Sequence, residues 1–410
     1  MHALAPAARR RERRIKVTRR LAVVPLCLSI GILLAHTAIQ AVGASDEVRA
    51  LWVRRPSLDS QEAIRKMVSS AATSGFNTLF VQATDEAGAT PLTFDPLAET
   101  INQAHTAGLR VHAWIDIARV TPPGELPFAR DHVVYQHPEW LMVPRAIAAE
   151  LVATDVRSPD YLGRLARWTR SNADHIDGLY VSPLVPEAAS YLAEGVRDIV
   201  RRYAVDGVYL DHVSFPAADF DYGMRSIAAF RDVVRSELPF SERQRIDGIQ
   251  ALDPFAYPNE LPDQWRSFRR SQLTALVARL RTTVKSMRPA AIVSAAVTAD
   301  VAAAERDNLQ DWRTWVENGF IEALCPMVTG ADAARITAQL SDVNAFSAGR
   351  PFWAGIGANR LSQRETVDGI GAARRAGAQG IVLFSYDTLI SPPKGTEFLS
   401  AIGRGAFAGS

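Results

Sequence analysis

Cysteine is nearly absent from this chain, which holds only two in 410 residues. Cys27 lies in an apolar stretch near the N-terminus. Cys325 is the only thiol after residue 44, so that part of the chain cannot form an internal disulfide. The apolar neighbours of Cys325 predict a packed core thiol rather than a nucleophile.

The motifs of several kinds of chemistry are also missing. No glycine-rich nucleotide loop follows an apolar run, and the eight histidines show no HxxxH or HxH spacing for zinc. No G-x-S-x-G motif marks a serine hydrolase. The net charge is only +2, with the basic excess in the first twenty residues, so no nucleic-acid surface is expected. We therefore expect no cofactor, no metal and no nucleic-acid partner.

The first 44 residues have the pattern of a targeting segment. A basic stretch ends at Arg20, residues 21–42 are mostly apolar, and small residues up to Ala44 suit cleavage by signal peptidase. The apolar stretch is close to membrane-spanning length, although a proline and two polar residues interrupt it. The pattern predicts export with cleavage after Ala44, and an uncleaved membrane anchor is the alternative. In both cases the exported domain covers residues 46–405.

Eight strand-like runs alternate with amphipathic helical segments in that domain. The runs cover residues 49–53, 76–82, 109–116, 205–211, 291–297, 323–328, 352–357 and 380–386. Strands that alternate with helices pair in parallel through right-handed crossovers. A count of eight favours a closed barrel over an open sheet, so the sequence predicts the α/β class and a (β/α)8 (TIM) barrel.

Two connections are much longer than the usual few residues. One covers residues 118–190, after the third strand, and the other covers residues 217–263, after the fourth. Both leave the C-terminal ends of their strands, where TIM barrels carry their active sites. We expect long loops here that build a substrate cleft.

The run 205–211 ends in a carboxylate, Asp211, at the end of a strand that is otherwise mostly apolar. Because side chains alternate along a strand, Gly207, Tyr209 and Asp211 share one face. A polar group at this end of a barrel strand points towards the active site, so Asp211 is the first catalytic candidate. The plainer alternative is an aspartate that caps the next helix or holds a loop.

Carboxylates and aromatic residues with few lysines are typical of a sugar site. Cleavage of a glycosidic bond needs a second carboxylate as nucleophile or base. The sequence leaves this partner open among Asp116, Glu86 and Asp300, in that order. Aromatic rings stack on pyranose faces, and polar neighbours bind hydroxyl groups. The candidate substrate contacts are Trp114, Tyr209, His112, Gln82, His212, Trp140 and Tyr386.

Several sequence blocks carry a resemblance to a known family. They include Arg49-Ala50-Leu51-Trp52-Val53, Gly108-Leu109-Arg110-Val111-His112-Ala113-Trp114, His137-Pro138-Glu139-Trp140-Leu141, the run from Asp206 to Asp211, and Phe384-Ser385-Tyr386. In these blocks the chain resembles the bacterial glycosyl hydrolase-like 10 family. The resemblance implies a barrel of the bacterial envelope that hydrolyses glycosidic bonds, in some members those of peptidoglycan strands.

The chain departs from the family pattern at its candidate site. Trp114-Ile115-Asp116 stands where the family usually has Trp-Leu-Asn, and His212 and Ser214 stand where an aromatic residue and an arginine are frequent. The sequence predicts an exported glycoside hydrolase acting on an envelope or extracellular polysaccharide. The alternative is a catalytically inactive carbohydrate-binding barrel. The sparse set of metal ligands disfavours a metal-dependent hydrolase.

Overall fold

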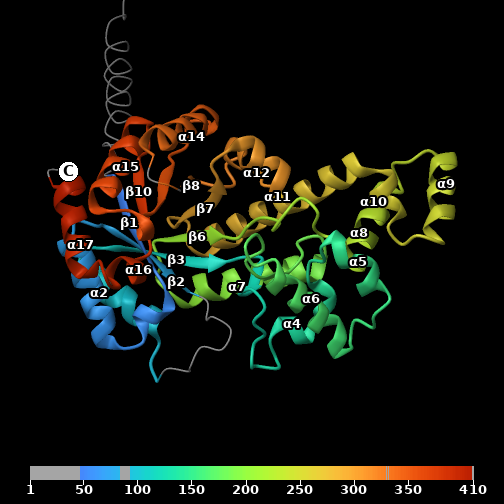
Figure 1. Ribbon diagram of the computed structural model, residues 1–410, viewed down its shortest axis with the longest axis horizontal. Coiled ribbons are helices and arrows are strands. Elements are labelled where there is room, and N and C mark those ends of the chain that lie inside the picture. The colour runs from blue at the N-terminus through green and yellow to red at the C-terminus, as the bar shows by residue number, and fades with distance from the viewer. Residues whose placement is uncertain (1–46, 84–92, 329, 331, 409–410) are drawn as a thin grey trace, which may run out of the picture. The chain divides into compact units, whose positions relative to one another are not determined.

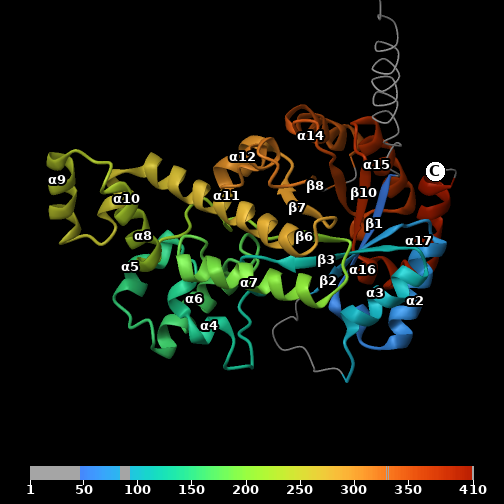
Figure 2. The same cartoon turned by 180° about the vertical axis from the view of Figure 1, so that it is seen from behind.

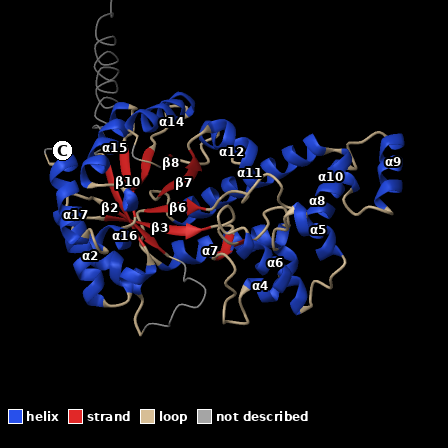
Figure 3. Cartoon of the chain, in the orientation of Figure 1, coloured by secondary structure: helices blue, strands red, loops and turns tan. Residues whose placement is uncertain are grey.

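Eight parallel strands close into a barrel in the computed structural model, in the order β1-β2-β3-β6-β7-β8-β9-β10 (Figures 1 and 3). The structure describes residues 47–83, 93–328, 330 and 332–408. The predicted targeting segment and Glu86 lie outside them. The barrel strands are β1 (Val48–Val53), β2 (Thr78–Gln82), β3 (Arg110–Asp116), β6 (Gly207–Asp211), β7 (Ile292–Thr298), β8 (Ala323–Val328), β9 (Trp353–Gly357) and β10 (Gly380–Phe384).

The predicted TIM barrel is therefore confirmed, and all eight predicted runs form its strands. The boundaries differ by up to two residues. The largest difference at a C-terminal end is in β10, which stops at Phe384 because Ser385 caps the next helix through a capping box with Thr388. Tyr386 consequently lies in the first turn of a helix and not in a strand.

Helices surround the barrel on its outer side (Figure 3). They are α2 (Gln61–Thr73), α3 (Pro96–Thr106), α7 (Pro186–Arg202), α11 (Pro262–Met287), α12 (Val301–Asp307), α13 (Trp312–Glu317), α14 (Ala333–Phe346), α15 (Gln363–Arg375), α16 (Tyr386–Ile390) and α17 (Gly395–Ile402). Helices α7 and α11 run side by side along one flank, as both views show (Figures 1 and 2). None of the helices in the described part of the chain has the length and apolarity needed to cross a bilayer.

The barrel interior is filled by aromatic side chains. Trp52 stacks on Trp114 with ring centroids 4.8 Å apart, and Tyr209 meets Trp52 edge-on at 5.4 Å. Phe80 and Trp353 complete this packing with smaller residues between them. Such a filled interior is a core and not a channel, so chemistry is restricted to its ends.

The two long connections both follow the C-terminal ends of their strands and carry secondary structure of their own. The first carries β4 (Arg119–Thr121), α4 (Val133–Gln136), α5 (Arg145–Val152), α6 (Pro159–Ser171) and β5 (Leu179–Tyr180). The second carries α8 (Met224–Val234), α9 (Phe240–Gln250) and α10 (Ala256–Glu260). Proline is common in loops but also fits the first turn of a helix, as Pro159 and Pro186 do here. We call these two segments the first and second insertions.

The two insertions are joined by a buried carboxylate. Asp221, in the second insertion, is fully buried and accepts hydrogen bonds from the amides of Val143 (2.7 Å) and Gly223 (2.8 Å) and from the Ser226 hydroxyl. Val143 belongs to the first insertion, and its carbonyl in turn accepts from the Tyr222 amide at 2.7 Å. Burial raises the pKa of Asp221, although these hydrogen bonds oppose the rise. The two insertions therefore pack as one body beside the C-terminal end of β3 and β6 (Figure 1).

Candidate active site at the ends of β3 and β6

Two carboxylates stand next to each other at the C-terminal ends of neighbouring strands. Strands β3 and β6 pair in parallel so that Asp116 lies opposite Asp211. Their side chains are only 12% and 11% exposed. Trp114, two residues before Asp116, donates its indole N–H to Asp211 Oδ2 at 3.0 Å. The alternation of the two strands thus places a tryptophan and two acids on one face, as expected for a barrel site.

His212 follows Asp211 with a backbone φ of +47°, a left-handed conformation that is uncommon for a residue other than glycine. Its amide donates to Asp211 Oδ1 at 2.8 Å. Its ring lies between two further carboxylates, with Nδ1 2.6 Å from Asp116 Oδ1 and Nε2 2.9 Å from Asp177 Oδ2. The unusual backbone conformation therefore directs the imidazole into a cluster of acids.

The remaining members of the cluster come from the first insertion, where β4 and β5 pair as a short antiparallel ribbon. Arg119 donates to Asp116 Oδ2 at 2.7 Å, and Tyr180 donates to Asp177 Oδ1 at 2.6 Å. Position 178, directly after Asp177, requires glycine, since a Cβ there would lie 2.0 Å from the carbonyl oxygen of Thr121. Charges of alternating sign thus connect the ribbon to the barrel.

The two strand-end acids have opposite pKa shifts. Burial raises the pKa of Asp211, and the nearby His212 charge only partly offsets this. Burial acts in the same sense on Asp116, but hydrogen bonds and charge from His212 and Arg119 outweigh it and lower its pKa. Burial also disfavours the charged ring of His212, yet the three surrounding carboxylates raise its pKa to about 10. The surroundings thus favour the proton on Asp211 over Asp116.

Asp116, Asp211 and His212 each place one polar atom within 4.8 Å of the others, a spacing that a metal ion could occupy. The observed hydrogen bonds do not fit a metal, however. Both ring nitrogens of His212 face carboxylate oxygens, an arrangement that suits two N–H donors and leaves no lone pair for a metal. Among the described residues, this cluster is better understood as a network of ion pairs.

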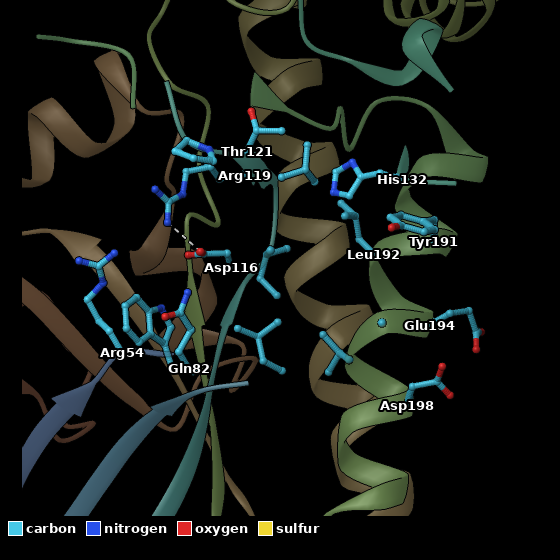
Figure 4. A pocket seen from close by; sticks show the side chains of 17 residues that line it. Arg54, Gln82, Asp116, Arg119, Thr121, His132, Tyr191, Leu192, Glu194 and Asp198 are labelled. Carbon is cyan, nitrogen blue, oxygen red and sulfur yellow. Dashed lines mark hydrogen bonds and ion pairs between the residues drawn. The ribbon is translucent and has the colours of Figure 1, made fainter. Parts of the chain in front are cut away.

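A cavity of about 770 Å³ opens beside the two acids (Figure 4). Trp114, Asp116 and Arg119 line it from β3 and β4, and helix α7 supplies the facing wall. On that wall Tyr191, Glu194 and Asp198 are labelled in Figure 4, opposite Arg54 and Gln82. Asp211 does not line the cavity itself and touches it through its hydrogen bond to Trp114. A cavity of this size accepts a short stretch of a sugar chain.

The predicted substrate contacts are distributed unevenly around this cavity. Gln82 and Trp114 line it, but both side chains are largely covered, and the Gln82 side-chain oxygen accepts from the Arg55 amide at 3.0 Å. Trp140 stacks on His137 with centroids 3.7 Å apart and lies 5.9 Å from Tyr191, behind the cavity wall. His212 is held within the ion-pair cluster.

Other predicted contacts lie deeper in the molecule. Tyr209 is fully buried in the barrel interior, with its hydroxyl 3.8 Å from the Met327 sulfur. His112 lies one layer further from the site, packed on Phe80, and burial lowers its pKa to about 3. Tyr386 is buried and faces α2. In this conformation these three side chains have no surface free for a sugar.

Of the two other candidates for the second carboxylate, only Asp300 belongs to the described residues. Asp300 caps α12, where its side chain accepts from the Ala303 amide at 2.9 Å. Glu86 lies outside the described residues. Asp116 is therefore the candidate that the structure brings next to Asp211.

Sequence reasoning missed Asp177, Arg119, Tyr180 and Tyr191. A signal was present for two of them, since residues 177–181 read Asp-Gly-Leu-Tyr-Val, which closely repeats the Asp-Gly-Val-Tyr-Leu of residues 206–210. This short strand pattern marks β5. Its position beside His212 depends on how the insertion folds and cannot be read from the local sequence.

A closed parallel (β/α)8 barrel with acids at adjacent strand ends is the architecture of many glycoside hydrolases. Two solved structures illustrate the similarity in fold. The catalytic domain of a β-amylase from Paenibacillus polymyxa matches with a TM-score of 0.55 at 12% identity, over 88% of this chain and 98% of that one. A β-galactosidase from Marinomonas ef1 matches with a TM-score of 0.59 at 11% identity, over 87% of this chain and 58% of that one. At such low identity these matches show the fold alone.

The family follows from the sequence comparison. The family model described as glycosyl hydrolase-like 10 matches residues 73–350, and the chain belongs to this family. Glycosyl hydrolase YngK of Bacillus subtilis (strain 168) is 22% identical over 57% of this chain and 39% of its own length. Glycosyl hydrolase DigH of Escherichia coli (strain K12) is 26% identical over 57% of this chain and 46% of its own length. The chain thus spans less than half of the length of these curated relatives.

Proposed function

We propose that this protein is an exported glycoside hydrolase that cleaves an envelope or extracellular polysaccharide with Asp211 and Asp116 as its carboxylate pair. One observation carries the proposal. Two acids on adjacent strand ends, with oxygen atoms within 4.8 Å, have pKa values moved in opposite directions beside a cavity. Such a division is what acid catalysis and nucleophilic attack require of two otherwise identical groups.

The proposed reaction follows from these protonation states. The reaction requires Asp211 to become accessible from the cavity, which it touches in this conformation only through Trp114. Asp211 then transfers its proton to the glycosidic oxygen, and the bond from that oxygen to the anomeric carbon breaks. Asp116 attacks the anomeric carbon and forms a glycosyl ester, since each of its oxygens keeps a lone pair beyond its bond to His212 or Arg119. Water, deprotonated by Asp211, then cleaves the ester and restores both acids. The short distance between the acids favours retention, because inverting enzymes separate theirs by roughly 6.5–9.5 Å.

Release of reducing ends from a panel of envelope polysaccharides, including peptidoglycan stripped of its stem peptides, tests the proposal. Asp211→Asn and Asp116→Asn should each lower the rate by about 10²- to 10⁴-fold. Asp300→Asn is the matched control, because asparagine also caps helices and should leave the rate unchanged. Glu86→Gln tests the candidate outside the described residues. Loss of activity in Glu86→Gln but not in Asp116→Asn would transfer the second role to Glu86.

The near-complete burial of Asp211 and Trp114 favours one rival, a carbohydrate-binding barrel without catalysis. Glycan binding that is equal in the wild type and Asp211→Asn, with no release from any substrate, would establish that rival. Export rests on the pattern of residues 1–44. A mature N-terminus at Ser45 in the secreted fraction would support cleavage, and an intact chain in the membrane fraction would support the anchor.

A further inference from the structure

The ring of His212 is held at both ends by carboxylates from different parts of the fold. Asp116 belongs to barrel strand β3, whereas Asp177 precedes β5 in the first insertion. Asp177 is itself fixed, because its second oxygen accepts from the Tyr180 hydroxyl at 2.6 Å. The ring therefore bridges the barrel and the β4–β5 ribbon.

This geometry determines the protonation state of the ring. A neutral imidazole carries one N–H and one lone pair, and the lone pair would face a carboxylate oxygen at 2.6 or 2.9 Å. Only the doubly protonated ring donates to both acids. The charged or titratable groups around it are Asp116 from β3, Arg119 from β4, Asp177 and Tyr180 from the β5 segment, and Asp211 from β6.

We propose that Asp177 is a positioning residue that keeps His212 a cation and thereby keeps Asp116 ionised beside Asp211. The part of this proposal that concerns catalysis rests on the function proposed above. Asp177 touches neither Asp116 nor Asp211 through a described hydrogen bond, so it acts through the ring. The ribbon of the first insertion thus controls the difference in charge between two acids on the barrel.

Removal of the Asp177 charge has a defined consequence. In Asp177→Asn the side-chain carbonyl still accepts from Nε2, so the ring keeps its place and loses one of its negative neighbours. A nearby opposite charge stabilises a charged form by about one to three pH units, and the titration of His212 should move down by that amount. Asp116 then faces a ring that becomes neutral at a lower pH, and its own titration moves up.

Nitrogen NMR of the full chain with ¹⁵N-labelled histidine tests the proposal without any need for activity. The His212 signals are assigned by their absence in His212→Asn. In the wild type both ring nitrogens should remain protonated from pH 6 to 9. In Asp177→Asn the midpoint should fall by one to three pH units, and Asp177→Glu should restore it. Asp174→Asn removes an exposed charge from the same segment and is the matched control.

A wild-type ring with an unprotonated nitrogen at pH 7 would overturn the proposal. So would a midpoint in Asp177→Asn that moves no further than in Asp174→Asn. If Asp177→Asn fails to fold, Asp177→Ser replaces it, since this change also removes the charge and should likewise lower the midpoint by one to three pH units. An NMR shift in a protein that releases no glycan would sustain the role of Asp177 and reject hydrolysis. Hydrolysis with no NMR shift would support the proposed function and reject the role of Asp177.

Discussion

The ion pairs of His212 should make the stability of the protein depend on pH above neutrality. The pKa of the ring rises from 6.5 to about 10 in the folded chain, despite burial, because three carboxylates surround it. This rise corresponds to about 5 kcal/mol of folding free energy. The lowered pKa values of Asp116 and Asp177 reflect the same ion pairs and add nothing further to that figure.

The sign follows from which form the folded state favours. The folded protein binds the His212 proton more tightly than the unfolded chain does, so the contribution is complete below pH 6.5 and is lost between pH 6.5 and about 10. His212→Asn has no imidazole proton to lose, so its folding stability lacks this decrease between pH 6.5 and about 10. Asparagine tolerates the left-handed backbone at this position, so the variant removes the charge with little backbone penalty.

Urea unfolding of the full chain at pH 6, 7.5, 9 and 10, followed by far-UV circular dichroism, measures the effect. The difference in unfolding free energy between the wild type and His212→Asn should be largest at pH 6 and should shrink by about 4 kcal/mol by pH 10, the midpoint at which half of the rings have lost the proton. His175→Asn makes the same change at an exposed histidine and is the matched control. A gap for His212→Asn that stays constant from pH 6.5 to 10 would refute the ion-pair argument.

Three further results are expected. Gly178→Ala should destabilise the protein by about 1–3 kcal/mol in urea unfolding because its Cβ would meet a carbonyl oxygen, whereas Gly248→Ala, which meets nothing within 4 Å in α9, should be neutral or slightly stabilising. Trp114→Phe removes a donor to the Asp211 carboxylate and should therefore move the alkaline limb of the pH–activity profile to higher pH. A limb that stays at the same pH would count against Asp211 as the acid. Tyr191→Ala should raise KM for a glycan roughly threefold to tenfold, with kcat little changed, if its ring stacks on a sugar in the cavity.

The barrel was predictable because its strands are short, buried and regularly spaced. Each run is bounded by helical periodicity, and a strand such as β6 depends mainly on its own residues and on the face they share. The neighbouring positions of Asp116 and Asp211 also follow from strand alternation once β3 and β6 are known to pair.

The rest of the site depends on contacts that are distant in sequence. Asp177 meets His212 across 35 residues, and only the folded insertion brings them together. The helices of the insertions, such as the one that Pro159 begins with a well-formed buried face, were not among the predicted segments. Tyr209 and His112 were predicted as substrate contacts. Their strand positions were correct, but in a filled barrel the inward-facing side chains below the rim are core.

The buried Asp221 has a consequence for how this family can diversify. Because one carboxylate binds amides of both insertions, neither segment can be exchanged alone without leaving a buried charge or buried amides unpaired. In this chain we therefore expect the two segments to be exchangeable only together, while the barrel with its two acids stays in place. Chimaeras between relatives should fold when both segments come from one parent and fail when they come from two.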